Sequence, residues 1–243
     1  MKVSVSGAPL ELFLDLGAYL PIALTASEME RSHVQVLPKM TQFRDALGQV
    51  MEAHHFLAKD VRLAGYEVGD LEGGEAVSMG GFAPPDRNGY IGRPLLARHL
   101  LVLDYPHHRI RFYESGNDAA MTLECGAARF KVELRDGAVQ SEGQTEFGRR
   151  RFLWDTGAQE NNIRPSVLPP EVVAAAPTID DGPPVVRIEH VALDGTDIGP
   201  QGFRLWAFEA PDVDAYLGAG LFSTRKVCLD IAMGRGAVAP AGG

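Results

Sequence analysis

The chain lacks the features that would direct it to a membrane or to nucleic acid. None of its apolar runs approaches the roughly 20 residues that a helix needs to cross a bilayer. Acidic residues outnumber basic ones, 32 to 23, which gives a net charge of -9 and a sequence pI near 5.3. Nucleic-acid binding needs a basic face, and Arg149-Arg150-Arg151 is short and is interpreted as the solvated face of a strand. We therefore expect neither a membrane nor a nucleic-acid partner.

The chain is also poor in residues that hold metals or form cross-links. Cys125 and Cys228 are the two cysteines, too few for a disulfide framework. Because Cys228 lies in an apolar run, the sequence favours a buried free thiol over a disulfide. The pairs His54-His55 and His107-His108 lack the spacing of zinc motifs, and no Ser or Cys nucleophile motif is present. We expect no metal site and no cofactor.

The N-terminus lacks the pattern of a signal peptide. It has one Lys and no apolar h-region, and a first strand is expected almost at once. The compartment therefore stays open at this stage: cytoplasmic if the chain is complete, periplasmic or secreted if a signal was removed.

Turn-forming residues between short apolar runs are abundant. The chain contains 27 Gly and 16 Pro, and 45% of its residues are hydrophobic. Alternating segments joined by tight links such as Asp136-Gly137 predict β-hairpins over 3–14 and 130–154. Short helices are expected over 94–100 and 219–224. The sequence thus predicts an all-β fold with short helices.

The two halves of the chain repeat a set of motifs in the same order. Asp15-Leu16-Gly17-Ala18 in the first half matches Asp155-Thr156-Gly157-Ala158 in the second. Three further pairs of segments follow them: 61–69 with 191–199, 90–92 with 216–218, and 101–104 with 227–230. A polar, turn-rich stretch at 114–118 separates the halves. We predict an internal duplication, with an N-terminal lobe over 1–115 and a C-terminal lobe over 116–243.

Each half places a carboxylate at the end of an apolar strand, just before a tight turn. Asp15 and Asp155 both follow three-residue apolar runs. Burying an unpaired carboxylate is costly, so two such positions in one chain suggest two carboxylates that meet. Asp104 and Asp230, in contrast, are expected to be surface or turn residues of the last strand of each half.

These motifs resemble those of the pepsin/retropepsin superfamily of aspartic peptidases. The resemblance rests on the tetrapeptide at Asp155, on a downstream glycine in each half, and on the segment Asn88-Gly89-Tyr90-Ile91-Gly92-Arg93-Pro94-Leu95-Leu96, which is similar to the retropepsin Gly-Arg segment. It implies a single chain of two homologous retropepsin-like β-barrel lobes, the pepsin-like bilobal acid protease fold. Asp15 and Asp155 match the catalytic positions. The implied protein is a monomeric aspartic endopeptidase that takes a peptide or protein substrate and needs no cofactor.

The chemistry of such a site explains the residue types in both loops. Two carboxylates about 3 Å apart cannot both ionise easily, so they share a proton and activate a water between them. Gly17 and Gly157 let the loops turn tightly, and Ala18 and Ala158 belong to the same supporting loops. In the family the Thr of each loop donates hydrogen bonds across the pair, a role that Thr156 fits.

The first loop departs from this pattern. Leu16 has no hydroxyl, so half of the crossed lock is absent. This leaves open an alternative, a catalytically weak or inactive peptide-binding module on the same fold. Tyr19 stands where retropepsins carry an Asp that pairs with the Arg of their Gly-Arg segment, so we expect a different partner for Arg93. A third hypothesis is a dimer in which the Asp155 loops of two chains meet.

A flap, which is a hairpin that closes over the substrate, is expected between the Asp15 loop and the next hairpin. Residues 43–49 are the candidate, with Phe43 and Gly48 as its marked positions. The second lobe is shorter in the corresponding stretch, 178–184. Substrate would lie extended across the cleft, paired to the backbone as a β-strand ligand.

Overall fold

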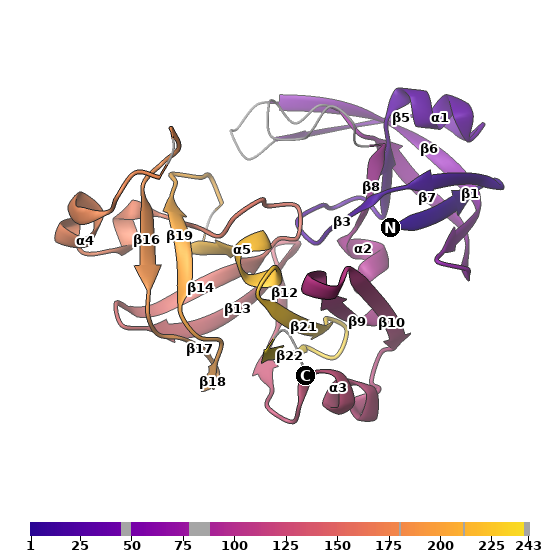
Figure 1. Ribbon diagram of the computed structural model, residues 1–243. Helices are drawn as coiled ribbons and strands as arrows, with labels where there is room; N and C mark the ends of the chain where they lie inside the picture. The colour runs from indigo at the N-terminus through magenta and orange to yellow at the C-terminus, as the bar shows by residue number, and fades with distance from the viewer. Residues whose placement is uncertain (45–49, 78–87, 180, 211, 241–243) are drawn as a thin grey trace. The chain divides into compact units, whose positions relative to one another are not determined.

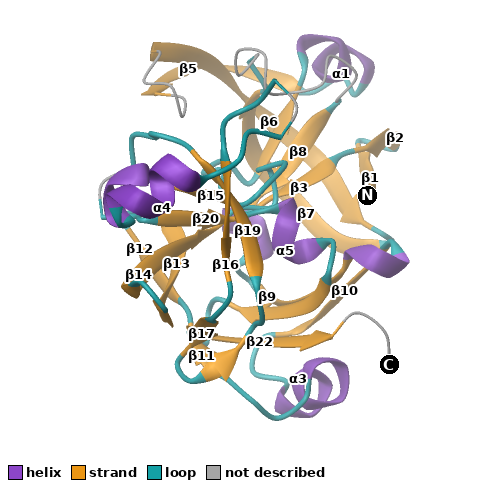
Figure 2. Cartoon of the chain, turned by 60° about the vertical axis from the view of Figure 1, so that its left-hand side comes forward, coloured by secondary structure: helices purple, strands orange, loops and turns teal. Residues whose placement is uncertain are grey.

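The computed structural model describes residues 1–44, 50–77, 88–179, 181–210 and 212–240. It divides into two compact units, Met1–Leu96 and Ala97–Gly243. Strands dominate both units and the helices are short (Figure 2). The predicted all-β class with short helices is therefore confirmed.

The first unit consists mainly of one twisted sheet and two short helices (Figure 1). Its elements are β1 (Lys2–Val5), β2 (Ala8–Glu11), β3 (Phe13–Asp15), β4 (Ile22–Leu24), α1 (Ala26–Arg31), β5 (Gln35–Arg44), β6 (Val50–Leu63), β7 (Tyr66–Glu75), β8 (Gly89–Gly92) and α2 (Arg93–Leu96). Among the described residues the strand order is β2-β1-β6-β7-β4-β8-β3, and β5 pairs with β6 outside this path. The predicted hairpin at the start of the chain is β1–β2, with Val3 opposite Leu10.

The second unit contains two sheets. Its elements are β9 (His99–Asp104), η1 (Tyr105–His107), β10 (Arg109–Glu114), α3 (Asp118–Cys125), β11 (Phe130–Lys131), β12 (Glu133–Arg135), β13 (Ala138–Thr145), β14 (Gly148–Trp154), β15 (Asn162–Ile163), η2 (Pro165–Val167), α4 (Pro170–Ala175), β16 (Val185–Ile188), β17 (Val191–Leu193), β18 (Thr196–Asp197), β19 (Gln201–Leu205), β20 (Ala215–Leu217), α5 (Ala219–Phe222), β21 (Arg225–Asp230) and β22 (Arg235–Pro240). The larger sheet has the order β16-β19-β15-β20-β14-β13-β17-β18, with β12 beside β13. The smaller sheet has the order β10-β9-β21-β22-β11.

A four-strand pattern occurs once in each unit. In the first unit β3 runs parallel to β8, β8 is antiparallel to β4, and β4 is parallel to β7. In the second unit β14, β20, β15 and β19 pair in the same order and with the same directions. The strands that end at the two loop aspartates therefore occupy equivalent positions. The matched segments 90–92 and 216–218 coincide with the ends of the equivalent strands β8 and β20, with Gly218 directly after β20.

The division into units does not follow the sequence repeat at its end. The predicted N-terminal lobe, 1–115, includes β9 and β10, whereas these strands belong to the second unit of the structure. There β9 pairs with β21, with Val102 opposite Cys228. The boundary at 115/116 describes the repeat and stays a prediction, while the compact units separate at 96/97.

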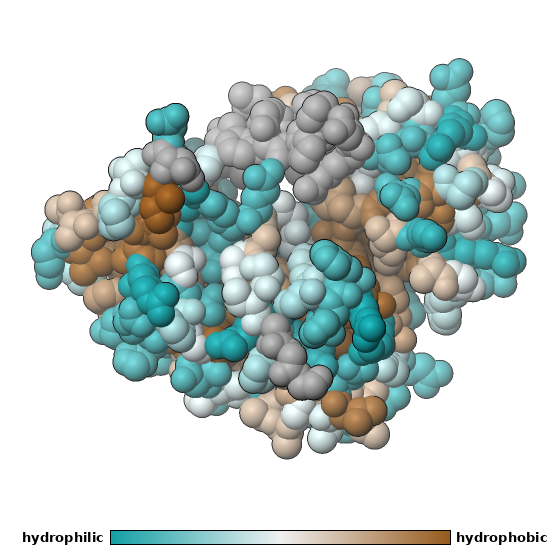
Figure 3. Space-filling model, in the orientation of Figure 1, coloured by the Kyte–Doolittle hydropathy of each residue, from teal (hydrophilic) through white to brown (hydrophobic). Residues whose placement is uncertain are grey.

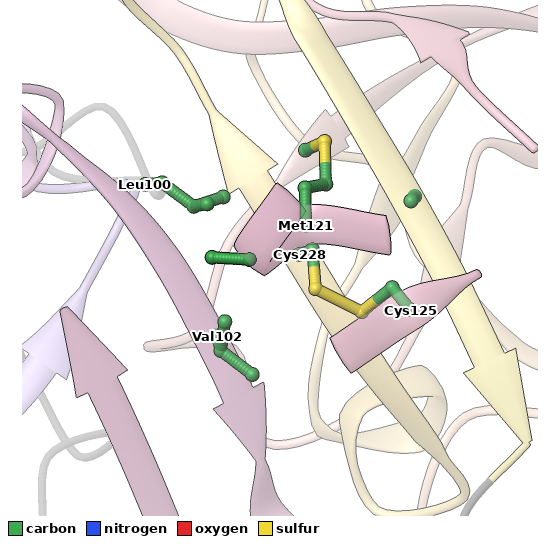
Figure 4. Close-up of a cluster of buried hydrophobic side chains, with 7 residues drawn as sticks. Leu100, Val102, Met121, Cys125 and Cys228 are labelled. Atoms are coloured by element: carbon green, nitrogen blue, oxygen red, sulfur yellow. A yellow bond between two sulfur atoms is a disulfide. The ribbon is translucent and has the colours of Figure 1, made fainter. Parts of the chain in front are cut away.

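The cysteines form a disulfide, so the predicted free thiol at Cys228 is wrong. Cys125 at the end of α3 is bonded to Cys228 of β21, with Cα atoms 6.2 Å apart. Figure 4 shows the bridge within a buried apolar cluster that also contains Met121, Leu100 and Val102. The apolar run around Cys228 correctly indicated burial. The partner lies 103 residues away, and a local sequence pattern does not report such a distance.

Asp104 and Asp230 are buried, which corrects the expectation that they lie at the surface. Asp230 is fully buried; it accepts hydrogen bonds from the Ser115 hydroxyl at 2.6 Å and from the Gly116 amide at 2.8 Å. Arg235 lies 3.3 Å from the same carboxylate. Asp104 contacts the Nδ1 atom of His107 at 2.7 Å. Both aspartates hold turns at the ends of strands, so their role is structural.

The polar stretch at 114–118 is a turn followed by a helix start. The side chain of Asn117 accepts a hydrogen bond from the Ala120 amide at 2.9 Å and so caps α3. Helices α1, α3 and α4 were not expected from the sequence, because each is short and lacks a long apolar period. On the face drawn in Figure 3 most residues are hydrophilic, with a small apolar patch over α4. Within the described part of the chain no helix is long and apolar enough to span a membrane.

Candidate active site

Asp15 ends β3 and turns back on its own loop. Its side chain is buried, 5% exposed. The Oδ1 atom accepts hydrogen bonds from the Gly17 amide at 2.9 Å and from the Ala18 amide at 3.0 Å. Two backbone donors on one oxygen fix the orientation of the carboxylate, which is the geometry of an Asx-turn.

Asp155 repeats this geometry in the second unit. Its Oδ1 atom accepts from the Gly157 amide at 2.8 Å and from the Ala158 amide at 3.2 Å. Its own amide donates to the Leu217 carbonyl at 3.0 Å, which ties the loop to β20. The tetrapeptides that the sequence matched therefore form the same turn.

A glycine stands directly behind each loop. A Cβ atom on Gly92 would lie 1.9 Å from the Leu20 carbonyl oxygen, and one on Gly218 would lie 2.3 Å from the Glu160 carbonyl oxygen. Because no side chain fits at these distances, the chain can pass the loop only at glycine. The residue after each glycine then donates its amide to the loop, to Ala18 O at 3.2 Å in the first unit and to Ala158 O at 3.0 Å in the second.

A buried asparagine supports the second loop and was missed from the sequence. Asn161 is 2% exposed, and its Oδ1 atom accepts from the amides of Gly218 at 2.8 Å and Leu221 at 3.2 Å. Its Nδ2 atom donates to the Gly202 carbonyl at 3.1 Å. In the first unit the backbone carbonyl of Pro21 accepts from Gly92 instead, at 3.0 Å. The only signal in the sequence was a polar residue directly before the short strand β15.

A tyrosine lies beside each loop on the neighbouring parallel strand. Burial raises the pKa of Tyr90, and the negative charge of Asp15 raises it further. Burial also raises the pKa of Tyr216 to about 12, with a further contribution from Asp155. The sequence matched these tyrosines as repeat markers without assigning them to the site. The pKa of each tyrosine is thus raised by the charge of the aspartate in its own unit.

Arg93 is a buried cation that belongs to the first unit alone. Its side chain is 8% exposed. Burial lowers its pKa, and the charge of Asp15 acts in the opposite direction. The sequence predicts that Arg93 has a partner other than the residue at position 19. The carboxylate that acts on Arg93 electrostatically is that of Asp15. The equivalent position in the second unit is Ala219, which carries no charge.

The residues after the two aspartates differ in their surroundings. Leu16 is fully buried, while Thr156 is partly buried. Asp15 belongs to the first unit and Asp155 to the second. That the two carboxylates meet, and that Thr156 forms its half of a crossed lock, both remain predictions.

The flap candidate, residues 43–49, begins where the pairing of β5 with β6 ends. β5 and β6 pair antiparallel up to Arg44 opposite Val50, with Phe43 opposite Met51. Gly48 lies outside the described residues. In the second unit the corresponding stretch is short, with one bridge between Thr178 and Pro184 before β16 begins. β5 and β6 are paired next to the candidate segment, and the flap itself stays a prediction.

A chain of polar side chains, here called the relay, connects β5, β6 and β7. His55 is 5% exposed and lies between the Thr41 hydroxyl and the Glu72 carboxylate, each 2.6 Å from a ring nitrogen. Because a carboxylate only accepts, Nδ1 donates to Glu72 and Nε2 accepts from Thr41 in the neutral ring. Lys39 bonds the same Glu72 oxygen at 2.5 Å. The hydrogen bond from Lys39, followed by that from His55, lowers the pKa of Glu72.

No cluster of three or more His, Cys, Asp or Glu side chains suited to a metal ion occurs among the described residues. The two aspartate loops are the candidates for chemistry that the sequence motifs single out.

Comparison with known proteins supports the fold. No family model matches the chain, and no curated protein sequence matches it. Among solved structures it is similar to the aspartic proteinase from Irpex lacteus, with a TM-score of 0.68 and 10% identity over 98% of this chain and 93% of that one. It is also similar to basic 7S globulin from soybean, with a TM-score of 0.57 and 12% identity over 96% of this chain and 88% of that one. The chain has the pepsin-like bilobal fold that it shares with an aspartic proteinase.

Proposed function

We propose that the protein is an aspartic endopeptidase that hydrolyses peptide bonds with Asp15 and Asp155 as its catalytic pair. The observation that supports this most is the duplicated carboxylate turn. In each unit one aspartate ends an equivalent strand, and two loop amides bind the same oxygen of it. A single Asx-turn at a strand end is common. Two on equivalent strands of a fold shared with an aspartic proteinase favour a shared function.

In this proposal the two carboxylates hold one proton and one water. The ionised carboxylate takes a proton from the water, which attacks the scissile carbonyl carbon. The protonated carboxylate donates to the carbonyl oxygen and stabilises the gem-diol that forms. Because the pair titrates as one unit, neither role belongs to one residue alone. The loop amides keep each carboxylate oriented throughout. The proposed protein acts as a monomer on a peptide or protein substrate, without a metal or cofactor.

The test is cleavage of a peptide library between about pH 3 and about pH 8. We expect cleavage by the native protein that falls at least about 100-fold in Asp155→Asn and in Asp15→Asn. A statine-type transition-state mimic should block it. Asp136→Asn is the matched control, because Asp136 is an exposed hairpin residue with a φ of 48° that Asn also adopts readily. Equal cleavage by all four proteins would exclude the carboxylate pair.

A peptide-binding module on the same fold is the second candidate. The specific observation is Leu16, which is fully buried where the second loop has Thr156. A folded protein that binds peptides without cleaving them at any pH would favour this function. The variant Leu16→Thr then tests whether the missing hydroxyl explains the lack of cleavage. Restored cleavage would identify position 16 as the cause, and no cleavage would count against the peptidase assignment. A sizing column distinguishes the proposed monomer from a dimer formed through the Asp155 loops.

A further inference from the structure

The second unit contains a surface hollow that the proposed reaction does not yet use. Its volume is about 600 Å³, within the range of small-ligand sites. It is lined by the start of η2, residues 164–166, and by residues 207–210 after β19. Both segments belong to the unit that carries Asp155. The hollow is large enough for one long side chain or for the end of a peptide.

One wall of the hollow leads to Asp155 through two aromatic rings. Phe208 lines the hollow and is 8% exposed. Its ring stacks on that of Tyr216, with centroids 4.3 Å apart. Tyr216 lies in β20 opposite Leu153, two residues before Asp155 in β14. The charge of Asp155 also raises the pKa of Tyr216. A group bound in the hollow therefore lies on the same side of the strand pair as the proposed reacting centre.

Arg164 supplies a positive charge to this hollow. Its Nη2 atom donates to the Ala210 carbonyl, and its guanidinium carbon lies 4.7 Å from the centre of the Phe208 ring. Its Nε atom is buried and has no hydrogen-bond partner in the part of the chain that the structure describes. Within that part Arg164 also forms no ion pair, unlike Arg204 and Arg187, which contact Glu160 and Glu189. The guanidinium is thus held in place without forming an ion pair with any of the described residues.

The remaining charge at the hollow is Glu209 at an exposed position. Solvent and salt screen an exposed carboxylate more strongly than a partly buried guanidinium. The hollow therefore suits a ligand with one anionic group on an apolar stem. Phe208 and the neighbouring alanines line the part of the hollow that would contact the stem. A fixed guanidinium is well suited to a carboxylate, because its planar donors match the two oxygens.

We propose that this hollow is a specificity subsite for a carboxylate of the substrate peptide, bound by Arg164 with its stem against Phe208. Two sources share this chemistry: an acidic side chain near the cleaved bond, or the C-terminal carboxylate of a short peptide. This inference rests on the proposed function, since it names the substrate class of the same site.

The experiment uses matched peptides and measures ratios. Each cleaved peptide is compared as a Glu and a Gln version at every position, and as a free C-terminal acid and its amide. We expect kcat/KM to be about 10- to 100-fold higher for the carboxylate member of one pair. Which pair responds identifies the source. The ratio within a pair does not depend on how much of the protein is folded.

Variants assign the preference to its residue. In Arg164→Met the ratio should fall to about one, and in Arg164→Lys part of it should remain because the charge is kept. Arg187→Met is the matched control: Arg187 is an exposed arginine outside the hollow, and the ratio should not change. Glu209→Gln should increase the preference, because it removes the like charge. Pairs cleaved equally by the native protein, or a ratio unchanged in Arg164→Met, would overturn the inference.

Failure of the subsite is distinguishable from failure of the proposed function. Cleavage that depends on Asp155 but shows no carboxylate preference would refute the subsite alone. If no peptide is cleaved, fluorescence anisotropy of the same peptide pairs gives the ratio of dissociation constants. A ratio that favours the carboxylate and is lost in Arg164→Met would support the subsite on a binding module. Equal binding of both members of every pair, or a preference for the carboxylate that is unchanged in Arg164→Met, would overturn it.

Discussion

The two aspartate loops have the same backbone and different supports. Both aspartates accept from the second and third amides that follow them, and both loops pack against a glycine. Behind Asp15 stand the buried Arg93 and the Pro21 carbonyl; behind Asp155 stands the side chain of Asn161. The difference teaches that the turn itself depends on Asp and Gly, while its anchoring depends on whichever polar group each lobe places nearby.

The largest expected difference between the units comes from the disulfide, which is confined to the second. Reducing Cys125–Cys228, which closes a separation of 103 residues, should lower the free energy of unfolding by about 4–5 kcal/mol. Hydrogen exchange should show lost protection in β21 and α3, with β6 and β7 of the first unit unchanged. The control is the Cys125→Ser/Cys228→Ala double variant, which should not respond to reductant. If reductant does not change the free energy of unfolding of the native protein, the disulfide between Cys125 and Cys228 is contradicted. A bridge that persists in purified protein would favour an oxidising compartment.

The next effect tests the close approach behind each loop. Gly92→Ala and Gly218→Ala should each destabilise by about 3 kcal/mol, because their Cβ atoms would meet a carbonyl oxygen at 1.9 and 2.3 Å. The first should cost more. Urea unfolding measures both. Gly202→Ala is the control, since the nearest atom to its Cβ is a Val185 methyl at 3.9 Å, and it should change stability by less than about 0.5 kcal/mol.

A smaller effect separates the two anchors. Asn161→Ala leaves the amide of Gly218 without its acceptor and removes one of the two acceptors of the Leu221 amide, which should cost about 2 kcal/mol. Pro21→Ala keeps the carbonyl that accepts from Gly92 and should cost less than about 1 kcal/mol. Thermal unfolding of both variants gives the comparison. Equal losses would show that the side chain of Asn161 adds nothing beyond a backbone carbonyl.

The smallest effect concerns the tyrosines beside the loops. The pKa of Tyr216, about 12, should fall in Asp155→Asn by less than about one unit, because burial, the larger cause, remains. A raised tyrosine pKa means that the neutral phenol stabilises the fold fully below about pH 10. This contribution is lost as the pH rises through about 12. NMR titration of ring-labelled tyrosine measures the shift.

The same titration compares the two units. Asp15→Asn should lower the pKa of Tyr90 and leave that of Tyr216 unchanged, since each phenol responds to its own aspartate. Asp136→Asn should change neither. A Tyr216 pKa that is the same in the native protein and in Asp155→Asn would show that its ring lies outside the field of the carboxylate.

Local patterns predicted the backbone of the site well. The Asp-x-Gly-Ala loops, the hairpins and the glycines at the ends of β8 and β20 all follow from alternation, turn residues and repetition along the chain. Arg93, Asn161 and the disulfide could not be predicted with their partners. Each depends on a side chain that meets a group far away in sequence: Cys125 meets Cys228, and Asn161 meets Gly218 and Gly202.

The sequence by itself determined the β class, the recurrence of the Asp-x-Gly-Ala loop and the position of each carboxylate before a turn, because strand alternation and turn formation involve neighbours in the chain. Tertiary structure decided which groups hold those turns, which cysteines are bonded, and that Asp104 and Asp230 are buried. It also placed Arg164 and Phe208 at one hollow, because the pairing of β15 with β19 brings together segments that are distant in the sequence. The physical reason is that side-chain partners are chosen by packing in space, where hydrogen bonding and burial must be satisfied together.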